Sequence, residues 1–163
     1  MANTIKTFHD LATFLTENKV PHAIEPATQV IELATSSPPL PGNLFLKMNT
    51  TVPFLQVVQF IAEVPEGRIR DIESATVRLN HLYEVPCFGF DRERRRLYYR
   101  VTALVLPTEG ISTTVLNALT SGCINAAKEF FEPLKMVIDG RSGDEMDAVL
   151  AEVGASRKPK VGA

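Results

Sequence analysis

The sequence predicts an α+β fold, with an antiparallel five-stranded sheet packed against two or three helices in the order α-β-β-β-α-β-β-α. Two observations lead to this prediction. Apolar residues recur at helical spacing in three segments, at 8–19, 69–83 and 113–137, and short apolar runs rich in β-branched residues lie between these segments. The length of 163 residues, 45% of them hydrophobic, fits one domain with a real core.

The first helix is expected to begin after Thr7 and to end near Lys19. Thr7 is a suitable N-cap residue, and Val20-Pro21 ends the helical pattern. The β-branched run 30–34 predicts the first strand. The proline-rich stretch 36–42 predicts a loop, because it forbids any regular element.

The next two strands are expected at 43–49 and 51–64, joined by a turn near Asn49-Thr50. The second strand is apolar on both parities. We therefore expect it to be central in its sheet, with both faces at least partly covered. Pro65-Glu66-Gly67 ends it.

A second helix is expected at 69–83, followed by a hairpin. The hairpin strands are the apolar runs 86–90 and 97–106, and the charged segment 91–96 lies between them. This basic segment is expected to form a solvated tip, where its charges discourage edge-to-edge strand pairing.

The longest helix is expected after Ser112, which is a plausible cap. Its apolar stripe recurs at steps of four and three: Val115, Leu119, Cys123, Ala126, Phe130, Leu134 and Val137. Pro133 predicts a kink, or a stop and restart, near Phe131-Glu132.

A short last helix is expected at 142–153, where Ser142 and Glu145 have the spacing of a capping box. The domain prediction is one α+β domain over 1–153 and a flexible basic tail over 154–163.

Composition argues against several classes of partner. The formal net charge of −2 gives no strong field to attract nucleic acid or an anionic membrane. There is no signal-peptide pattern and no apolar stretch that approaches a membrane span. Two cysteines without zinc-type or redox-motif spacing favour a reduced cytoplasmic location, although a disulfide between Cys87 and Cys123 stays open.

No catalytic residue, metal ligand or cofactor is predicted. The histidines, His9, His22 and His81, each stand alone in the sequence, and both cysteines fit small buried hydrophobes better than nucleophiles. The arginines of 92–96, with Arg100, could contact phosphate, but charge runs at hairpin tips are usually solvated, and Asp91 and Glu93 partly neutralise this one. A nucleic-acid role is therefore disfavoured. Single-strand binding pairs basic residues with exposed aromatics, and only Tyr98 and Tyr99 would qualify.

Several segments together resemble the YbjN family, a group labelled as candidate bacterial sensory transduction regulators. They are Val77-Arg-Leu-Asn80-His-Leu-Tyr83, Phe88-Gly-Phe90-Asp91, Leu97-Tyr-Tyr-Arg100 and Val105-Leu-Pro, followed by a long helix with a late proline. The resemblance covers about residues 5–138. It implies an architecture similar to that of type III secretion chaperones, which are small α+β dimers that hold extended segments of client proteins.

The strands carry more apolar surface than the predicted helices can cover, so we expect part of it to meet another chain. A homodimer is the simplest arrangement. The function predicted is a non-enzymatic, chaperone-like or adaptor module that holds a client protein segment in a groove or by strand addition. The residues predicted to line this surface are Phe45, Phe54, Val58, Phe60, Tyr98 and Tyr99.

Two alternatives remain at this point. One is a small-molecule sensor or enzyme with a pocket between the sheet and the long helix. The other is a purely structural dimer that holds no client. A ligand of the first kind would raise the thermal stability of the protein, because it stabilises only the state that it binds.

Overall fold

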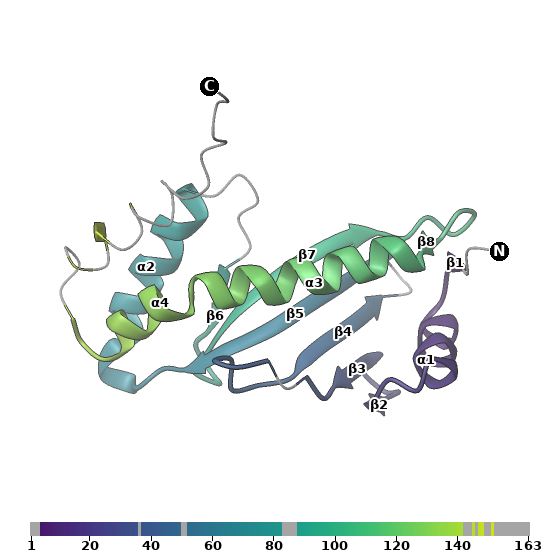
Figure 1. The fold of residues 1–163 in the computed structure, drawn as a ribbon, viewed down its shortest axis with the longest axis horizontal. Coiled ribbons are helices and arrows are strands. Elements are labelled where there is room, and N and C mark those ends of the chain that lie inside the picture. Colours follow the sequence, from purple (N-terminus) through teal and green to yellow (C-terminus); the bar gives the residue numbers. More distant parts are fainter. Residues whose placement is uncertain are drawn as a thin grey trace, which may run out of the picture.

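The computed structural model describes residues 4–35, 37–49, 52–82, 88–141, 145, 147, 148 and 151. Figure 1 shows the elements along this chain. They are β1 Thr4–Ile5, α1 Phe8–Glu17, β2 His22–Glu25, β3 Val30–Leu33, β4 Leu44–Asn49, β5 Phe54–Glu63, the 3₁₀ turn η1 Glu66–Arg68, α2 Ile69–Leu82, β6 Phe88–Asp91, β7 Arg96–Leu104, β8 Ile111–Ser112, α3 Thr113–Glu129 and α4 Phe131–Ile138.

The predicted antiparallel sheet is confirmed, with one strand more than expected. Six strands pair in the order β2-β3-β4-β5-β7-β6, and β1 and β8 form a separate pair. Sequence reasoning missed β2, which lies between Pro21 and Pro26 and has no apolar run. It is an edge strand, and three of its four residues are exposed.

Only one face of the sheet carries a core. The buried strand residues share one parity, and the pairing register places them on the same side of the sheet. They are Ile31, Leu33, Leu44, Leu46, Met48, Leu55, Val57, Gln59, Ile61, Phe88, Leu97 and Tyr99. The prediction that β5 is central is therefore confirmed. The alternate β5 side chains are half-buried, which agrees with the prediction that both faces are at least partly covered, although only one face carries the core.

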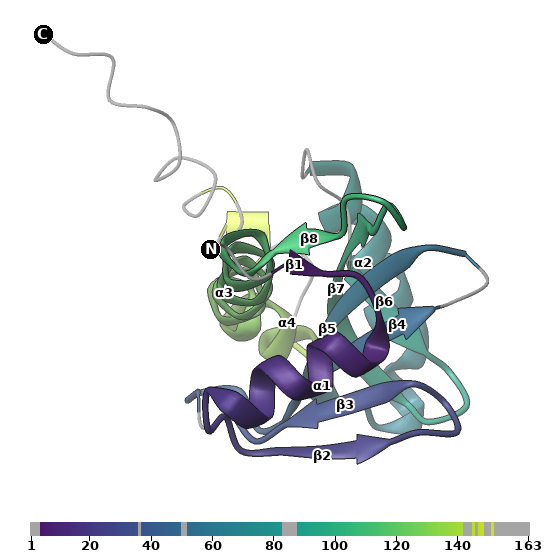
Figure 2. The ribbon, with the colours of Figure 1, turned by 90° about the vertical axis from the view of Figure 1, so that its right-hand side faces the viewer.

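The long helix α3 covers this core by lying across β5 and β7 (Figure 1), and the turned view places it to one side of the sheet (Figure 2). It buries Leu116, Cys123 and Ala127. The sulfur of Cys123 lies 3.5 Å from the carbonyl oxygens of Val57 and Tyr99, which fits the prediction of a buried small hydrophobe.

The predicted stripe of α3 was wrong at its first residue. Val115 is 45% exposed, whereas its neighbour Leu116 is buried. Leu116, Cys123, Ala127 and Phe130 follow at steps of seven, four and three, which keeps them on one side of a helix. Val115 lies about 100° around the helix from Leu116 and so turns away from the sheet.

The predicted stop and restart near Pro133 is confirmed. The first helix segment ends at Glu129, Phe130 leaves helical geometry with φ −99° and ψ 3°, and α4 begins at Phe131. Pro133 falls in the first turn of α4, where its missing N–H would have had no helical partner. Phe130 packs edge-on against Phe88, with ring centroids 5.3 Å apart.

Two of the three predicted helix caps are confirmed, and the third, at Ser142, lies outside the described residues. Thr7 accepts a hydrogen bond from the Asp10 amide at 3.1 Å, and the Asp10 carboxylate accepts one from the Thr7 amide at 3.0 Å, which completes a capping box. The Lys6 amide also donates to this carboxylate, at 3.0 Å, and this bond contributes most to lowering the pKa of Asp10. The Ser112 hydroxyl accepts from the Val115 amide at 3.2 Å.

Asn80, near the end of α2, fixes the start of β6. Its amide nitrogen donates to the Phe88 carbonyl oxygen at 2.7 Å, and its amide oxygen accepts from the Phe88 N–H at 2.8 Å. The side chain thus offers the backbone the same pair of bonds that a neighbouring strand would offer. We call this pair of hydrogen bonds the Asn80 clamp. It explains structurally why an asparagine precedes the hairpin.

The predicted loop at 36–42 is described from residue 37 onward. It contributes Leu40 to the core, at 6% exposure, and has one isolated bridge between Ser37 and Leu40. The predicted turn at Asn49-Thr50 and the helix at 142–153 reach beyond the described residues, while Tyr83, Cys87 and the tail 154–163 lie wholly outside them. No helix within the described ranges is long and apolar enough to cross a membrane.

Candidate protein-binding surface

The face of the sheet opposite α3 carries large side chains that the core does not bury. We call it the open face and define it by ten residues: Phe45 and Lys47 of β4, Phe54, Gln56, Val58 and Phe60 of β5, and Tyr98, Arg100, Thr102 and Leu104 of β7. These side chains share one side because the register aligns them across the three strands. Phe45, Val58 and Arg100 form one row.

Five of the six predicted surface residues lie on the open face. Phe45, Phe54, Val58, Phe60 and Tyr98 are all half-buried there. The sixth, Tyr99, is only 4% exposed and belongs to the core, where its ring lies 4.8 Å from that of Phe88. Successive side chains of a strand point to opposite faces, so Tyr98 and Tyr99 could not both line one surface.

Sequence reasoning missed the most exposed apolar side chain of the open face. Leu104 is 71% exposed and pairs with Phe54 at one end of the sheet. The parity of β7 could have revealed it, since Leu104 stands an even number of residues from Tyr98. The exposed cations Arg100 and Lys47 were not assigned to this surface either.

At the other end of the open face, two aromatic rings lie against glycine backbones. A Cβ at Gly89 would collide with the Tyr98 ring, and one at Gly42 would collide with the Phe60 ring. Phe60 pairs with Tyr98 across β5 and β7, and the Arg96 guanidinium lies 5.5 Å from the Phe60 ring centre. The two glycines therefore let these rings lie close to the sheet, which fixes their positions.

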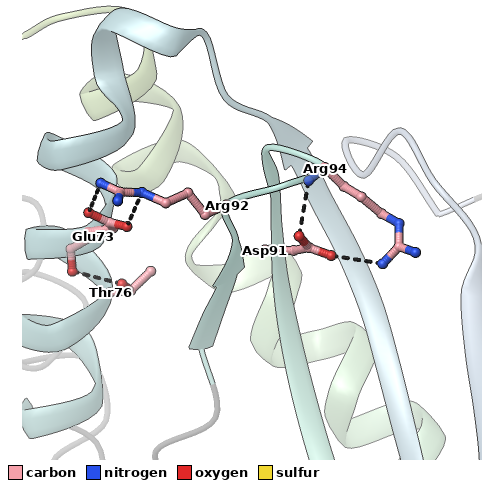
Figure 3. Close-up of polar contacts among 5 residues, drawn as sticks. All are labelled: Glu73, Thr76, Asp91, Arg92 and Arg94. Atoms are coloured by element: carbon pink, nitrogen blue, oxygen red, sulfur yellow. Dashed lines mark hydrogen bonds and ion pairs between the residues drawn. The ribbon is translucent and has the colours of Figure 1, made fainter.

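The basic hairpin tip is largely occupied by its own ion pairs (Figure 3). Arg92 pairs with Glu73 of α2 at 3.2 Å, and Arg94 pairs with Asp91 at 3.1 Å. The Arg94 amide donates to the Asp91 carboxylate, and this bond is the main reason that the pKa of Asp91 is lowered. The tip thus contacts α2 through Arg92. Of its four arginines, at 92 and 94–96, two are engaged in these ion pairs.

A small cavity lies between the end of β5 and α4. Its volume is about 180 Å³, and it is lined by Pro41, Ile61, Ala62, Glu63, Phe131, Lys135 and Ile138. Pockets that bind metabolites usually measure about 300–1,000 Å³. This one would accept a single apolar side chain or a ligand of a few heavy atoms.

Candidate groups for chemistry do not converge in the described residues. His9 and His81 are exposed on different helices, and the Nδ1–H group of His22 donates to the Val20 carbonyl oxygen at 2.7 Å. No group of three His, Cys, Asp or Glu side chains within these ranges could hold a metal ion.

Comparison with known proteins gives a likeness of fold. No family model matches the sequence, and no curated protein matches it. Among solved structures, a chain of the ExsC–ExsE complex superposes with a TM-score of 0.55 at 16% identity, covering 82% of this chain and 97% of that one. YbjN from E. coli, described as a candidate transcription regulator, superposes with a TM-score of 0.58 at 10% identity, covering 91% and 96%.

Identities this low establish the fold and not the function. Both superpositions nevertheless cover nearly the whole of the other chain, so the likeness extends over the sheet and its helices and is not confined to one motif. The chain therefore has a YbjN-like fold of the type III secretion chaperone kind, as the sequence resemblance implied.

Proposed function

We propose that this protein is a non-enzymatic module of the cytoplasm that binds a segment of a client protein on the open face of its sheet. The observation that carries the proposal is the open face itself. Phe45, Phe54, Val58, Phe60 and Tyr98 are only half-buried on a face that no described helix covers, and Leu104 is 71% exposed beside them. Contiguous apolar surface of this kind is typical of sites for protein partners.

The composition of the open face also suits a protein partner. Aromatic residues and arginine are enriched at protein interfaces, and this face presents four aromatic rings together with Arg100. The likeness to a chain that was crystallised in a complex of two proteins adds support. The chemistry of the described residues offers no competing set of catalytic groups.

We further propose that the protein acts as a homodimer through a surface other than the open face, because a two-fold interface lets one patch cover itself. Light scattering tests this directly. A dimer gives twice the monomer mass of 18.0 kDa, and a monomer at working concentrations would refute it.

The experiment for client binding compares two matched substitutions. Leu104→Asp places a charge on the open face, and Val77→Asp places one at an almost equally exposed site on α2, since the two residues are 71% and 70% exposed. Neither change buries the new carboxylate, so both variants should stay folded, and circular dichroism checks this. The measurement is a tagged pull-down from native lysate, read by mass spectrometry.

The proposal predicts a stoichiometric protein partner that is retained by Val77→Asp and lost with Leu104→Asp. A partner that is retained by both variants would place the binding site elsewhere. A protein that captures no partner at native salt would remove the support for a client-binding function.

A second candidate is a small-molecule sensor, and the cavity between β5 and α4 is the observation that favours it. Lys135 is half-exposed at its lining, although it pairs with Asp139 at 2.9 Å. A panel of metabolites tested by thermal unfolding would detect such a ligand, and Ile61→Phe, which fills the cavity, should abolish the shift.

A further inference from the structure

The open face has a pattern of charge that selects among client segments. Arg100 is exposed on β7 between Tyr98 and Thr102, and Lys47 is exposed on β4 opposite Gln56. Neither cation forms an ion pair within the described part of the chain. The register puts them two strands and two residues apart, or about 12 Å between Cα atoms from ordinary strand spacings.

Apolar side chains lie on either side of these cations along the strands. Phe54 and Leu104 form a pair at one end of the open face, and Phe60 and Tyr98 form a pair at the other. The two pairs are six positions apart along β5, which corresponds to about 20 Å. A segment that spans both pairs would need about seven residues as a strand or about fourteen as a helix.

Covering the middle of this face has an electrostatic cost that depends on the partner. An uncharged segment would take Arg100 and Lys47 out of water without compensation, and a basic segment would also repel them. A carboxylate would accept hydrogen bonds from the Arg100 guanidinium, in a geometry that arginine and carboxylate groups match well. The surface therefore favours acidic groups between two apolar ends.

Single-stranded nucleic acid also combines negative charge with apolar faces, but the rest of the molecule disfavours it. The acidic residues Glu25 and Glu32 lie on the neighbouring strands β2 and β3, on the same side of the sheet. The whole chain has a net charge of −2, so no broad positive field follows the path of a polyanion.

We propose that the client segment is a peptide with apolar residues at both ends and Asp or Glu in the middle, held over Arg100 and Lys47. This inference rests on the proposed function, because it specifies the chemistry of the segment that the open face binds. It predicts a preference for acidic peptides, which the shape of the open face alone would not produce.

The test selects random 16-residue peptides from a display library on immobilised protein. The wild type, Leu104→Asp, Arg100→Glu and Arg70→Glu serve as parallel targets, and sequencing reads the peptides that each retains. Arg70 is exposed on α2 and is not a residue of the open face, so it provides a matched charge reversal. Circular dichroism confirms that each variant is folded.

The inference predicts that peptides that depend on Leu104 are enriched in Asp and Glu on the wild type and on Arg70→Glu, and that Arg100→Glu removes this enrichment. For one selected peptide, labelled for fluorescence anisotropy, Arg100→Glu should weaken binding about tenfold or more, and Arg70→Glu less than about twofold.

Other outcomes separate the two proposals. Peptides that depend on Leu104 but show no acidic enrichment would overturn this inference and leave client binding intact. If no selected peptide depends on Leu104, both proposals fail. Binding of a labelled 16-nucleotide oligo(dT) that depends on Arg100, without any such peptide, would replace the protein client with a single-stranded nucleic acid.

Discussion

The Asn80 clamp gives the sharpest test of how the hairpin is held. Replacing Asn80 with Ala removes two hydrogen bonds, of 2.7 and 2.8 Å, between α2 and the first residue of β6. A hydrogen bond contributes about 0.5–1.5 kcal/mol, so the pair should contribute about 1–3 kcal/mol. Alanine has a helix propensity about 0.5 kcal/mol more favourable than that of asparagine. The free energy of unfolding should therefore fall by about 1.5 kcal/mol.

For a chain of this length, that loss should lower the melting temperature by about 3–6 °C. The matched control is Asn125→Ala on the exposed side of α3, where the propensity gain applies and no clamp exists. We expect it to melt slightly above the wild type. Urea unfolding, followed by circular dichroism, should give the same order of stabilities.

A companion variant tests the donor half of the clamp. Asn80→Asp keeps an acceptor for the Phe88 N–H but turns a second oxygen toward the Phe88 carbonyl, which raises the pKa of the new carboxyl. Its stability deficit should be large at neutral pH and should shrink as the carboxyl gains a proton in acid. The reasoning is refuted if Asn80→Ala and Asn125→Ala have the same melting temperature. It is also refuted if the stability deficit of Asn80→Asp does not change with pH.

Three other predictions concern the core, the aromatic contact and the first cap. Val57→Asp should abolish folding while Val58→Asp leaves a folded protein, because Val57 is fully buried under α3 and Val58 is on the open face; circular dichroism separates the two. Phe130→Ala should cost about 3–5 kcal/mol in urea unfolding, since Phe130 is 1% exposed. Asp10→Asn should remove a stabilisation that is present above pH 3.8 and lost as the pH falls through the lowered pKa of Asp10. The measurement is the free energy of unfolding of the wild type and of the variant against pH. The difference between the two should shrink only in that acidic range.

The helices were predictable because their local signals are strong. Thr7 and Ser112 cap α1 and α3 as the sequence indicates, and Pro133 marks the restart at α4. These features depend on a few neighbouring residues, so sequence alone contains them. The strand β2 escaped notice because its exposed edge position demands no apolar pattern.

The side of each strand could not be predicted in the same way. Val57 and Val58, like Tyr98 and Tyr99, are chemically identical neighbours that point to opposite faces. The position of α3 decides which residue of each pair is buried, and that position depends on the tertiary packing of the whole domain. The misplacement of Tyr99 and the omission of Leu104 have a different cause, because the alternation of side chains along β7 was readable from the sequence.

The pairing of β1 with β8 has a consequence for the synthesis of the chain. It joins Thr4–Ile5 to Ile111–Ser112, and next to it the Lys6 ammonium donates to the Thr108 carbonyl across 102 residues. A ribosome that adds about 5–20 residues per second needs roughly 5–20 s to make this second half available. Strand β1 must therefore remain without this partner until residues 111 and 112 have emerged, when most of the chain has been made.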